Sequence, residues 1–144
     1  MVFRIECVSK STNKKFTNKG TNDAWLLKVD NNGNLQWQKT IGGSSVDKAN
    51  DIIQTSDGGF AVLGYSESND GDVTINEGSK DFWIIKTNAK GNVIWEKTFG
   101  FSGNEEGMAI IQTNDHGFLL VGSIDISASN GQENAKTPSK KHAG

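Results

Sequence analysis

Few side chains in this chain of 144 residues could act as acids, bases or nucleophiles, and they form no familiar catalytic motif. The two histidines are His116, which follows Asp115, and His142 near the C-terminus. A Ser–His–acid mechanism needs a histidine that a third group orients, and the sequence around each histidine indicates no such group. The single cysteine, Cys7, excludes a disulfide framework and a Cys-based zinc site within one chain. We therefore expect no catalytic residue and no cofactor.

Two acidic loops resemble the start of a calcium site, which needs several oxygen ligands. Residues 30–34 read Asp-Asn-Asn-Gly-Asn, but residues 88–92 repeat this turn without the carboxylate. A hairpin turn explains both segments, whereas calcium explains only the first. The loop around Asp70 and Asp72 places two carboxylates on either side of a glycine, with Glu77 nearby. We expect no metal site, and Asp70 and Asp72 are the weak candidates for one.

Charge and hydropathy exclude several classes of partner. The net charge is −2, but residues 20–126 carry 7 Lys against 15 Asp and Glu, while both ends are mildly basic. An acidic body repels phosphate backbones, so we expect no nucleic-acid partner. No apolar run approaches the ~18 residues of a membrane-spanning helix. The charged N-terminal residues do not form a signal peptide, so the protein is either cytoplasmic or a piece whose targeting segment lies elsewhere.

An internal repeat organises the chain, and repeats of this size are typical of propellers and solenoids. Residues 23–68 align with 81–126 without a gap at a constant offset of 58, and 18 of these 46 pairs are identical. Residues 3–11 match 60–68 more weakly, as part of a third copy. The predicted organisation is a leftover strand and linker (1–22), a first repeat (23–68), a connector (69–80), a second repeat (81–126) and a disordered tail (127–144).

Each repeat is expected to contain four short strands, because polar turn residues separate runs that are apolar or alternate with period two. In the first repeat the strands are 25–29, 35–41, 49–55 and 60–65. Glycine supplies the positive φ of a tight hairpin between the first two strands. The positions kept in both copies more often serve packing than ligand binding; they are Trp25 and Trp83, Trp37 and Trp95, Gly33 and Gly91, and Asp57 and Asp115.

Two further matched pairs leave a choice open. Asp47 corresponds to Glu105, and Lys39 corresponds to Lys97. They could form a repeated ligand site on one face, or a salt bridge or turn cap in each repeat. We favour the structural interpretation, because exposed pairs of this kind are common and contribute only ~0–1 kcal/mol.

These features predict an all-β fold of antiparallel four-stranded units. Strands such as 118–121 (Phe-Leu-Leu-Val) are apolar without alternation, which is typical of strands buried on both faces. A four-stranded sheet covered on both faces by its own copies describes a β-propeller blade. Because a ring normally needs four to eight blades, two repeats would form an incomplete propeller. The alternative is a sandwich of two sheets packed face to face.

The motifs Asp-x-Trp-x-x-Lys, Gly-Asn-x-x-Trp-x-Lys-Thr and Ile-Ile-Gln-Thr-x-Asp-x-Gly-Phe together resemble β-propeller-type repeats of bacterial secreted and surface proteins. The resemblance covers residues 23–126, and residues 3–11 more weakly. It implies an extracellular or cell-surface location and a non-catalytic scaffold or binding role, including adhesion. The implied partners are other blades of a parent protein or copies of the chain itself. The alternative is a fragment of a propeller enzyme such as a quinone-dependent dehydrogenase, although two repeats cannot enclose its central cofactor pocket.

Overall fold

The computed structural model describes residues 2–8 as backbone, and residues 21–74, 76 and 79–125 in full. The predicted disordered tail, 127–144, lies outside the described residues. Within them the chain is all β and contains no helix, so none of the described residues belongs to a helix able to cross a membrane. The strands are β1 (Val2–Val8), β2 (Asn22–Val29), β3 (Leu35–Ile41), β4 (Asp47–Gln54), β5 (Phe60–Ser66), β6 (Asp81–Thr87), β7 (Val93–Phe99), β8 (Asn104–Gln112) and β9 (Phe118–Asp125).

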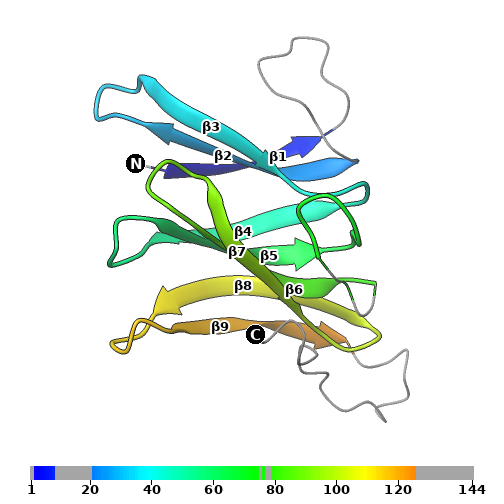
Figure 1. Cartoon of the computed structure of the whole chain (residues 1–144). Coiled ribbons are helices and arrows are strands. Elements are labelled where there is room, and N and C mark those ends of the chain that lie inside the picture. Colours follow the sequence, from blue (N-terminus) through cyan, green and yellow to red (C-terminus); the bar gives the residue numbers. More distant parts are fainter. Residues whose placement is uncertain (1, 9–20, 75, 77–78, 126–144) are drawn as a thin grey trace.

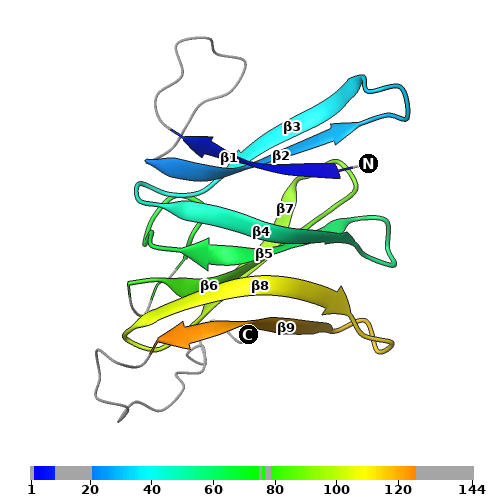
Figure 2. The ribbon, with the colours of Figure 1, turned by 180° about the vertical axis from the view of Figure 1, so that it is seen from behind.

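Three antiparallel sheets are stacked, with the middle sheet between the other two (Figures 1 and 2). The N-terminal sheet has the order β1-β2-β3, the middle sheet β4-β5-β6-β7, and the C-terminal sheet β8-β9. The prediction of an all-β antiparallel fold is confirmed. The described residues form three sheets, so the alternative of a two-sheet sandwich does not describe them.

The hydrogen-bonded sheets do not coincide with the sequence repeats. The four predicted strands of residues 23–68 are present as β2 to β5, but β2 and β3 belong to one sheet and β4 and β5 to the next. The expectation that each repeat forms one sheet is therefore wrong. The short link 42–46 carries the chain from one sheet to the next, and Asn22 and Val46 form a parallel bridge across this step. The connector 69–80 instead joins two neighbouring strands of the middle sheet.

The first two sheets repeat the same pairing of a strand with the Asp-x-Trp strand. β5 pairs with β6 in a register that places Val62 opposite Ile85, and β1 pairs with β2 so that Phe3 lies opposite Leu27. Leu27 corresponds to Ile85 in the repeat, so the structure equates Phe3 with Val62. The weak sequence match instead aligns Phe3 with Phe60, which lies two positions from Val62 on the same face of β5.

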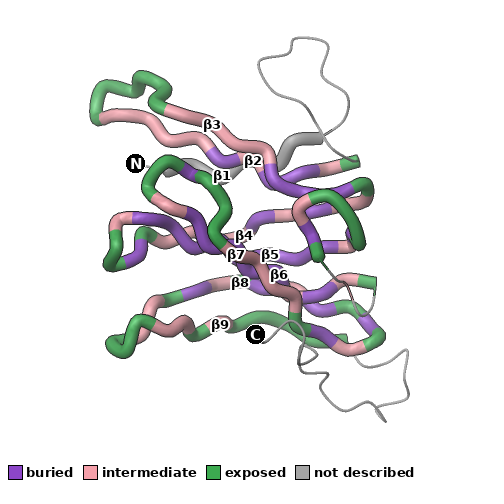
Figure 3. The backbone as a smooth tube through the Cα atoms, in the orientation of Figure 1, coloured by how far each residue is buried: buried purple, intermediate pink, exposed green. Residues whose placement is uncertain are grey.

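Strand β5 has both faces buried, which explains its unbroken apolar sequence (Figure 3). Val62 belongs to a core between the N-terminal and middle sheets, together with Leu26 and Trp83. Ala61 and Leu63 belong to a second core, which includes Ile110 of the C-terminal sheet. Since all the residues of β5 are buried, the middle sheet receives a neighbouring sheet on each face.

The predicted hairpin turns are present. Gly33 and Gly91 have φ of +88° and +80°, and Gly58 in the β4–β5 turn has φ of +85°. His116 occupies the position of Gly58 in the β8–β9 turn and has φ of +67°, a conformation that glycine adopts without steric cost. The second repeat therefore keeps the turn conformation of the first, although His116 replaces the glycine.

Candidate functional site

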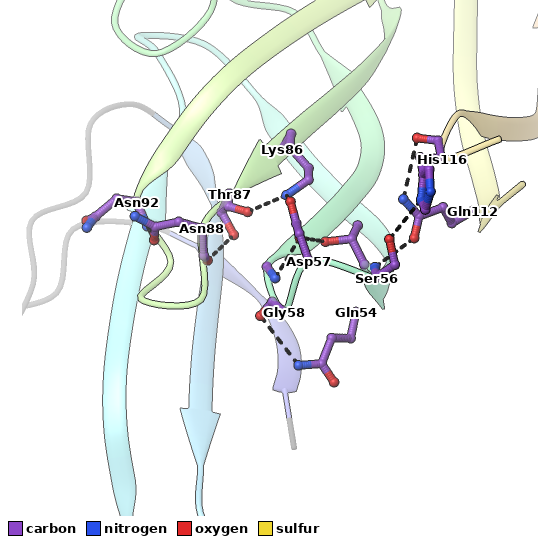
Figure 4. Close-up of polar contacts among 12 residues, drawn as sticks. Gln54, Ser56, Asp57, Gly58, Lys86, Thr87, Asn88, Asn92, Gln112 and His116 are labelled. Carbon is purple, nitrogen blue, oxygen red and sulfur yellow. Dashed lines mark hydrogen bonds and ion pairs between the residues drawn. The ribbon is translucent and has the colours of Figure 1, made fainter. Parts of the chain in front are cut away.

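The turns at one end of the sheets bring together polar residues from both repeats (Figure 4). Lys86 on β6 is buried, and its Nζ lies 3.1 Å from Oδ2 of Asp57 in the β4–β5 turn. The same Nζ donates a hydrogen bond of 2.8 Å to the carbonyl oxygen of Thr87. This ion pair joins the matched aspartate of the first repeat to the matched lysine of the second.

The Asp57 carboxylate is held by its own turn as well as by the lysine. It accepts hydrogen bonds from the Thr55 hydroxyl and, over 2.9 Å, from the Gly59 amide. The Thr55 bond, then the Gly59 bond, then Lys86 hold the pKa of Asp57 far below its ordinary value. The matched Asp115 accepts the equivalent bonds from Thr113 and Gly117, but no lysine pairs with it within the described residues. The end of the second repeat therefore lacks one partner that the first repeat has.

A Ser–His contact also forms between the two turns, which the sequence did not predict. The Oγ of Ser56 lies 3.0 Å from Nδ1 of His116, and the Ser56 amide donates to Oε1 of Gln112 over 2.8 Å. Both Ser56 and His116 are exposed. The paired residues lie 56 and 60 positions apart in the sequence. No sequence motif predicts these contacts, because they form only when the turns of neighbouring sheets lie together.

An open hollow of about 500 Å³ lies beside these turns. It combines charged and amide groups with two aromatic rings from neighbouring sheets, whose centroids are 6.1 Å apart in an edge-to-face arrangement. The lining residues are Ser56, Asp57, Lys86, Trp95, Gln112, His116 and Phe118.

The equivalent place in the first repeat is covered by the β6–β7 hairpin. Trp37 packs edge-to-face on Phe60 with centroids 5.8 Å apart, as Trp95 does on Phe118. In addition, the Trp37 Nε1 donates a 3.2 Å hydrogen bond to the carbonyl oxygen of Ala89 in that hairpin turn. A Cβ placed on Gly91 would lie only 2.7 Å from the Trp37 ring, so the turn rests directly on the indole.

The other two matched tryptophans form hydrogen bonds within their own sheets. Trp83 is buried in the core and donates through Nε1 to Oε2 of Glu96 over 3.0 Å. Trp25 is half-buried and makes the corresponding bond to Gln38. Both indole N–H groups bond within their own sheet, and Trp83 also packs in the core between the N-terminal and middle sheets. Trp37 and Trp95 pack on an aromatic ring of the next sheet.

The matched carboxylates Asp47 and Glu105 are buried where the chain passes from one sheet to the next, and Glu105 lies there beside Asp81. Asp81 and Glu105 are 0 % and 3 % exposed, and both crowd the α-carbon of Gly100: a Cβ there would lie 2.3 Å from Asp81 Oδ1 and 2.6 Å from Glu105 Oε2. Burial, and then the Asp81 charge among other neighbours, raises the pKa of Glu105 above its ordinary value. Oε2 of Glu105 accepts the Phe101 amide over 2.8 Å, while Oε1 has no hydrogen-bond partner among the described residues.

Asp47 occupies the same position in the first repeat. Its carboxylate accepts bonds from the Gly43 amide over 2.7 Å and from the hydroxyls of Ser66 and Ser68. Burial is the main reason why its pKa is raised, and the Asp23 charge adds to this effect. Within the described residues Asp47 forms no ion pair with Lys39, so the carboxylate caps a turn and does not form the alternative salt bridge.

The carboxylates of the two calcium candidates, Asp70 and Asp72, accept hydrogen bonds from backbone amides. Asp70 Oδ1 accepts the Ser44 amide over 2.7 Å, and Asp72 Oδ2 accepts the Gly42 amide over 3.0 Å. The Ser44 hydrogen bonds lower the pKa of Asp70. Among the described residues, no group of three or more His, Cys, Asp or Glu is placed to hold a metal ion. Both carboxylates therefore fasten the connector 69–80 to the link between β3 and β4.

No family model matches this sequence, and no curated protein resembles it closely enough to count as a relative. The functional interpretation therefore depends on the geometry of the two repeats.

Proposed function

We propose that the chain is a non-catalytic repeat module with a scaffold or binding role, built from propeller-like units of a bacterial surface or secreted protein. The observation that carries the proposal is the seating of the β6–β7 hairpin on Trp37. The repeated indole and the repeated turn glycine meet between repeats, where they join one sheet to the next. The surface location follows from the resemblance of the motifs alone.

The repeated charges support the same role. Lys86 and Asp57 come from different repeats and meet in one ion pair. Residues that recur with period 58 thus build the contact that every further repeat would make again. In repeat proteins such nearest-neighbour contacts supply much of the stability.

A third repeat tests the proposal directly. The variant replaces residues 126–144 by a second copy of residues 68–125, which continues the offset of 58. We expect a higher urea midpoint and a larger urea dependence, because the added hairpin covers Trp95 and more surface is buried. The same extension with Trp95→Ala serves as the control and should lose most of the gain. An extension that leaves the midpoint unchanged would contradict the proposal.

The Ser56–His116 contact is the observation that favours an enzyme instead. Among the described residues, no hydrogen bond orients the other side of the imidazole, as nucleophilic catalysis needs. The first repeat has Gly58 at the position of His116, so the contact is not part of the repeat. Hydrolysis of a nitrophenyl ester should be the same for the natural chain and for His116→Gly. A loss of hydrolysis in that variant would favour the enzyme.

A further inference from the structure

Within residues 79–125, which the structure describes, the C-terminal sheet contains β8 and β9 and no hairpin equivalent to β6–β7. The middle sheet consists of two strands, β4 and β5, followed by the β6–β7 hairpin, whereas β8 and β9 stand as a pair. The hollow beside Trp95 and Phe118 is the place that the β6–β7 hairpin fills beside Trp37 and Phe60.

The surroundings of the matched glycines Gly59 and Gly117 differ in the same way. A Cβ on Gly59 would lie 2.2 Å from the carbonyl oxygen of Thr87 and 2.8 Å from Nζ of Lys86. A Cβ on Gly117 would meet only atoms of its own turn, Asp115 Oδ1 at 3.1 Å and Thr113 Oγ1 at 3.2 Å. The space that β6 occupies at the first turn is therefore open at the second.

Apolar side chains are exposed along the same two strands. Leu119 and Val121 of β9 are each 60 % exposed, whereas the matched Ala61 and Leu63 of β5 are fully buried. Met108, Ile111 and Ile124 are also at least half exposed. Ile111 lies opposite Leu119 in the β8–β9 pairing, so these two exposed side chains share one face of the sheet, and exposed apolar side chains that gather on one face usually mark an interface.

Among the described residues, the β2–β3 hairpin is of the required type and its turn is uncovered. β2 and β3 contain the same motifs as β6 and β7, and Gly33 has no atom within 4 Å of an added Cβ, in contrast to Gly91. At the position 58 residues beyond Asp81, residues 139–144 read Ser-Lys-Lys-His-Ala-Gly and do not contain the Asp-x-Trp motif. The β2–β3 hairpin of a second copy carries the matching motifs and an open turn.

We propose that two copies of this chain associate head to tail, with the β2–β3 hairpin of one copy adding to β9 and resting on Trp95 of the other. This inference rests on the proposed scaffold role. By analogy with the middle sheet, β9 pairs with β2 so that Phe118 lies opposite Val29. The Trp95 Nε1 donates to the carbonyl oxygen of Asn31, and Lys28 pairs with Asp115.

The association requires an exchange of strands. β1 pairs with the edge of β2 that β9 would occupy, from Val2 opposite Lys28 to Val8 opposite Asn22. β9 therefore replaces β1, and it brings the apolar face that it shares with β8. Addition of a strand to an open sheet edge is an established mode of recognition, and a head-to-tail contact leaves a further open edge at each end of the pair.

Sedimentation velocity of the full chain over a range of concentrations tests the proposal. We expect concentration-dependent association, and we expect Gly33→Asn to raise the dissociation constant by about tenfold or more, because the new side chain meets the Trp95 ring. Gly58→Asn is the matched control: Gly58 has a similar positive φ and equally open surroundings, so it imposes the same backbone strain, and Gly58 does not line the hollow. A monomer at every concentration, or association that Gly33→Asn leaves unchanged, would overturn the proposal.

A charge exchange adds an independent measurement. Lys28→Glu and Asp115→Lys should each weaken association, and the double variant should restore it because the pair re-forms with opposite polarity. Failure of the double variant to restore association would overturn the proposed register. If association fails while the chain with a third repeat is still stabilised, the exchange between copies is wrong and the repeat-module function stands.

Discussion

Gly91 lies against the indole of Trp37, so close that a Cβ on the glycine would come within 2.7 Å of the ring. The two residues belong to different repeats and to different sheets. Gly91 provides the positive φ that its hairpin turn needs, and through this contact it also joins two sheets.

Trp37 and Trp95 should differ in their contribution to stability. Trp37→Ala should lower the free energy of unfolding by about 3–5 kcal/mol, as expected for a large aromatic residue covered by neighbours. Trp95→Ala should cost clearly less, because no hairpin covers it within the described residues. Urea unfolding of both variants measures the difference. Equal losses would contradict the different covering of the two rings.

Asp57 and Asp115 should differ in how much they contribute to the pH dependence of stability. The pKa of Asp57 is lowered in the folded state, so its stabilisation is present above its ordinary pKa of 3.8 and is lost as the pH falls below that value. Asp57→Asn should therefore destabilise the protein at pH 7 and reduce its loss of stability in acid. Asp115→Asn should have the same sign but a smaller effect, since no lysine pairs with Asp115. Thermal melts between pH 2 and pH 7 compare them, and a larger effect at Asp115 would refute the role of Lys86.

Glu105 should act in the opposite direction. Its pKa is raised in the folded state, so its contribution to stability decreases as the pH rises from its ordinary pKa of 4.5 through the raised value. Glu105→Gln should remove this decrease and stabilise the protein at pH 7 by about 1 kcal/mol, because an amide can donate to the neighbouring Asp81 carboxylate. Glu67→Gln, a change at a partly exposed position, serves as the control. Destabilisation by Glu105→Gln at pH 7 would show that the buried charge is needed.

Calcium should have little effect on this chain. Asp70 and Asp72 already accept backbone amides, so an added ion would have to break those bonds. We expect no heat of binding at micromolar calcium, and we expect Asp70→Ala to destabilise the protein in the absence of calcium. Micromolar binding in a calorimetric titration would restore the connector as a metal site.

The sequence predicted the strands well, because turn glycines and period-two alternation mark them locally. β3 has the predicted bounds, and β5 extends the predicted strand by one residue. The grouping of strands into sheets was not predictable in the same way. Both the link 42–46 and the connector 69–80 could carry the chain to a new sheet, and the sequence favours the longer one as the boundary.

The repeat alignment contains several residues of the candidate site, but it predicts neither the site nor the pairings of those residues. The period of 58 identified Trp37, Gly91, Asp57 and Lys86 as matched positions, yet it does not say which copy contacts which. The Ser56–His116 contact had no sequence signal at all, because only one of the two turns contains the histidine.

The contact of Gly91 with Trp37 is best tested by placing asparagine at each of the two matched hairpin glycines, in dilute protein where the chain is monomeric. Both positions have positive φ, so the backbone strain is the same. Gly91→Asn should cost about 1–3 kcal/mol more than Gly33→Asn in the free energy of unfolding, because only residue 91 is pressed against an indole. Equal costs for the two variants would contradict the claim that this hairpin joins one repeat to the next.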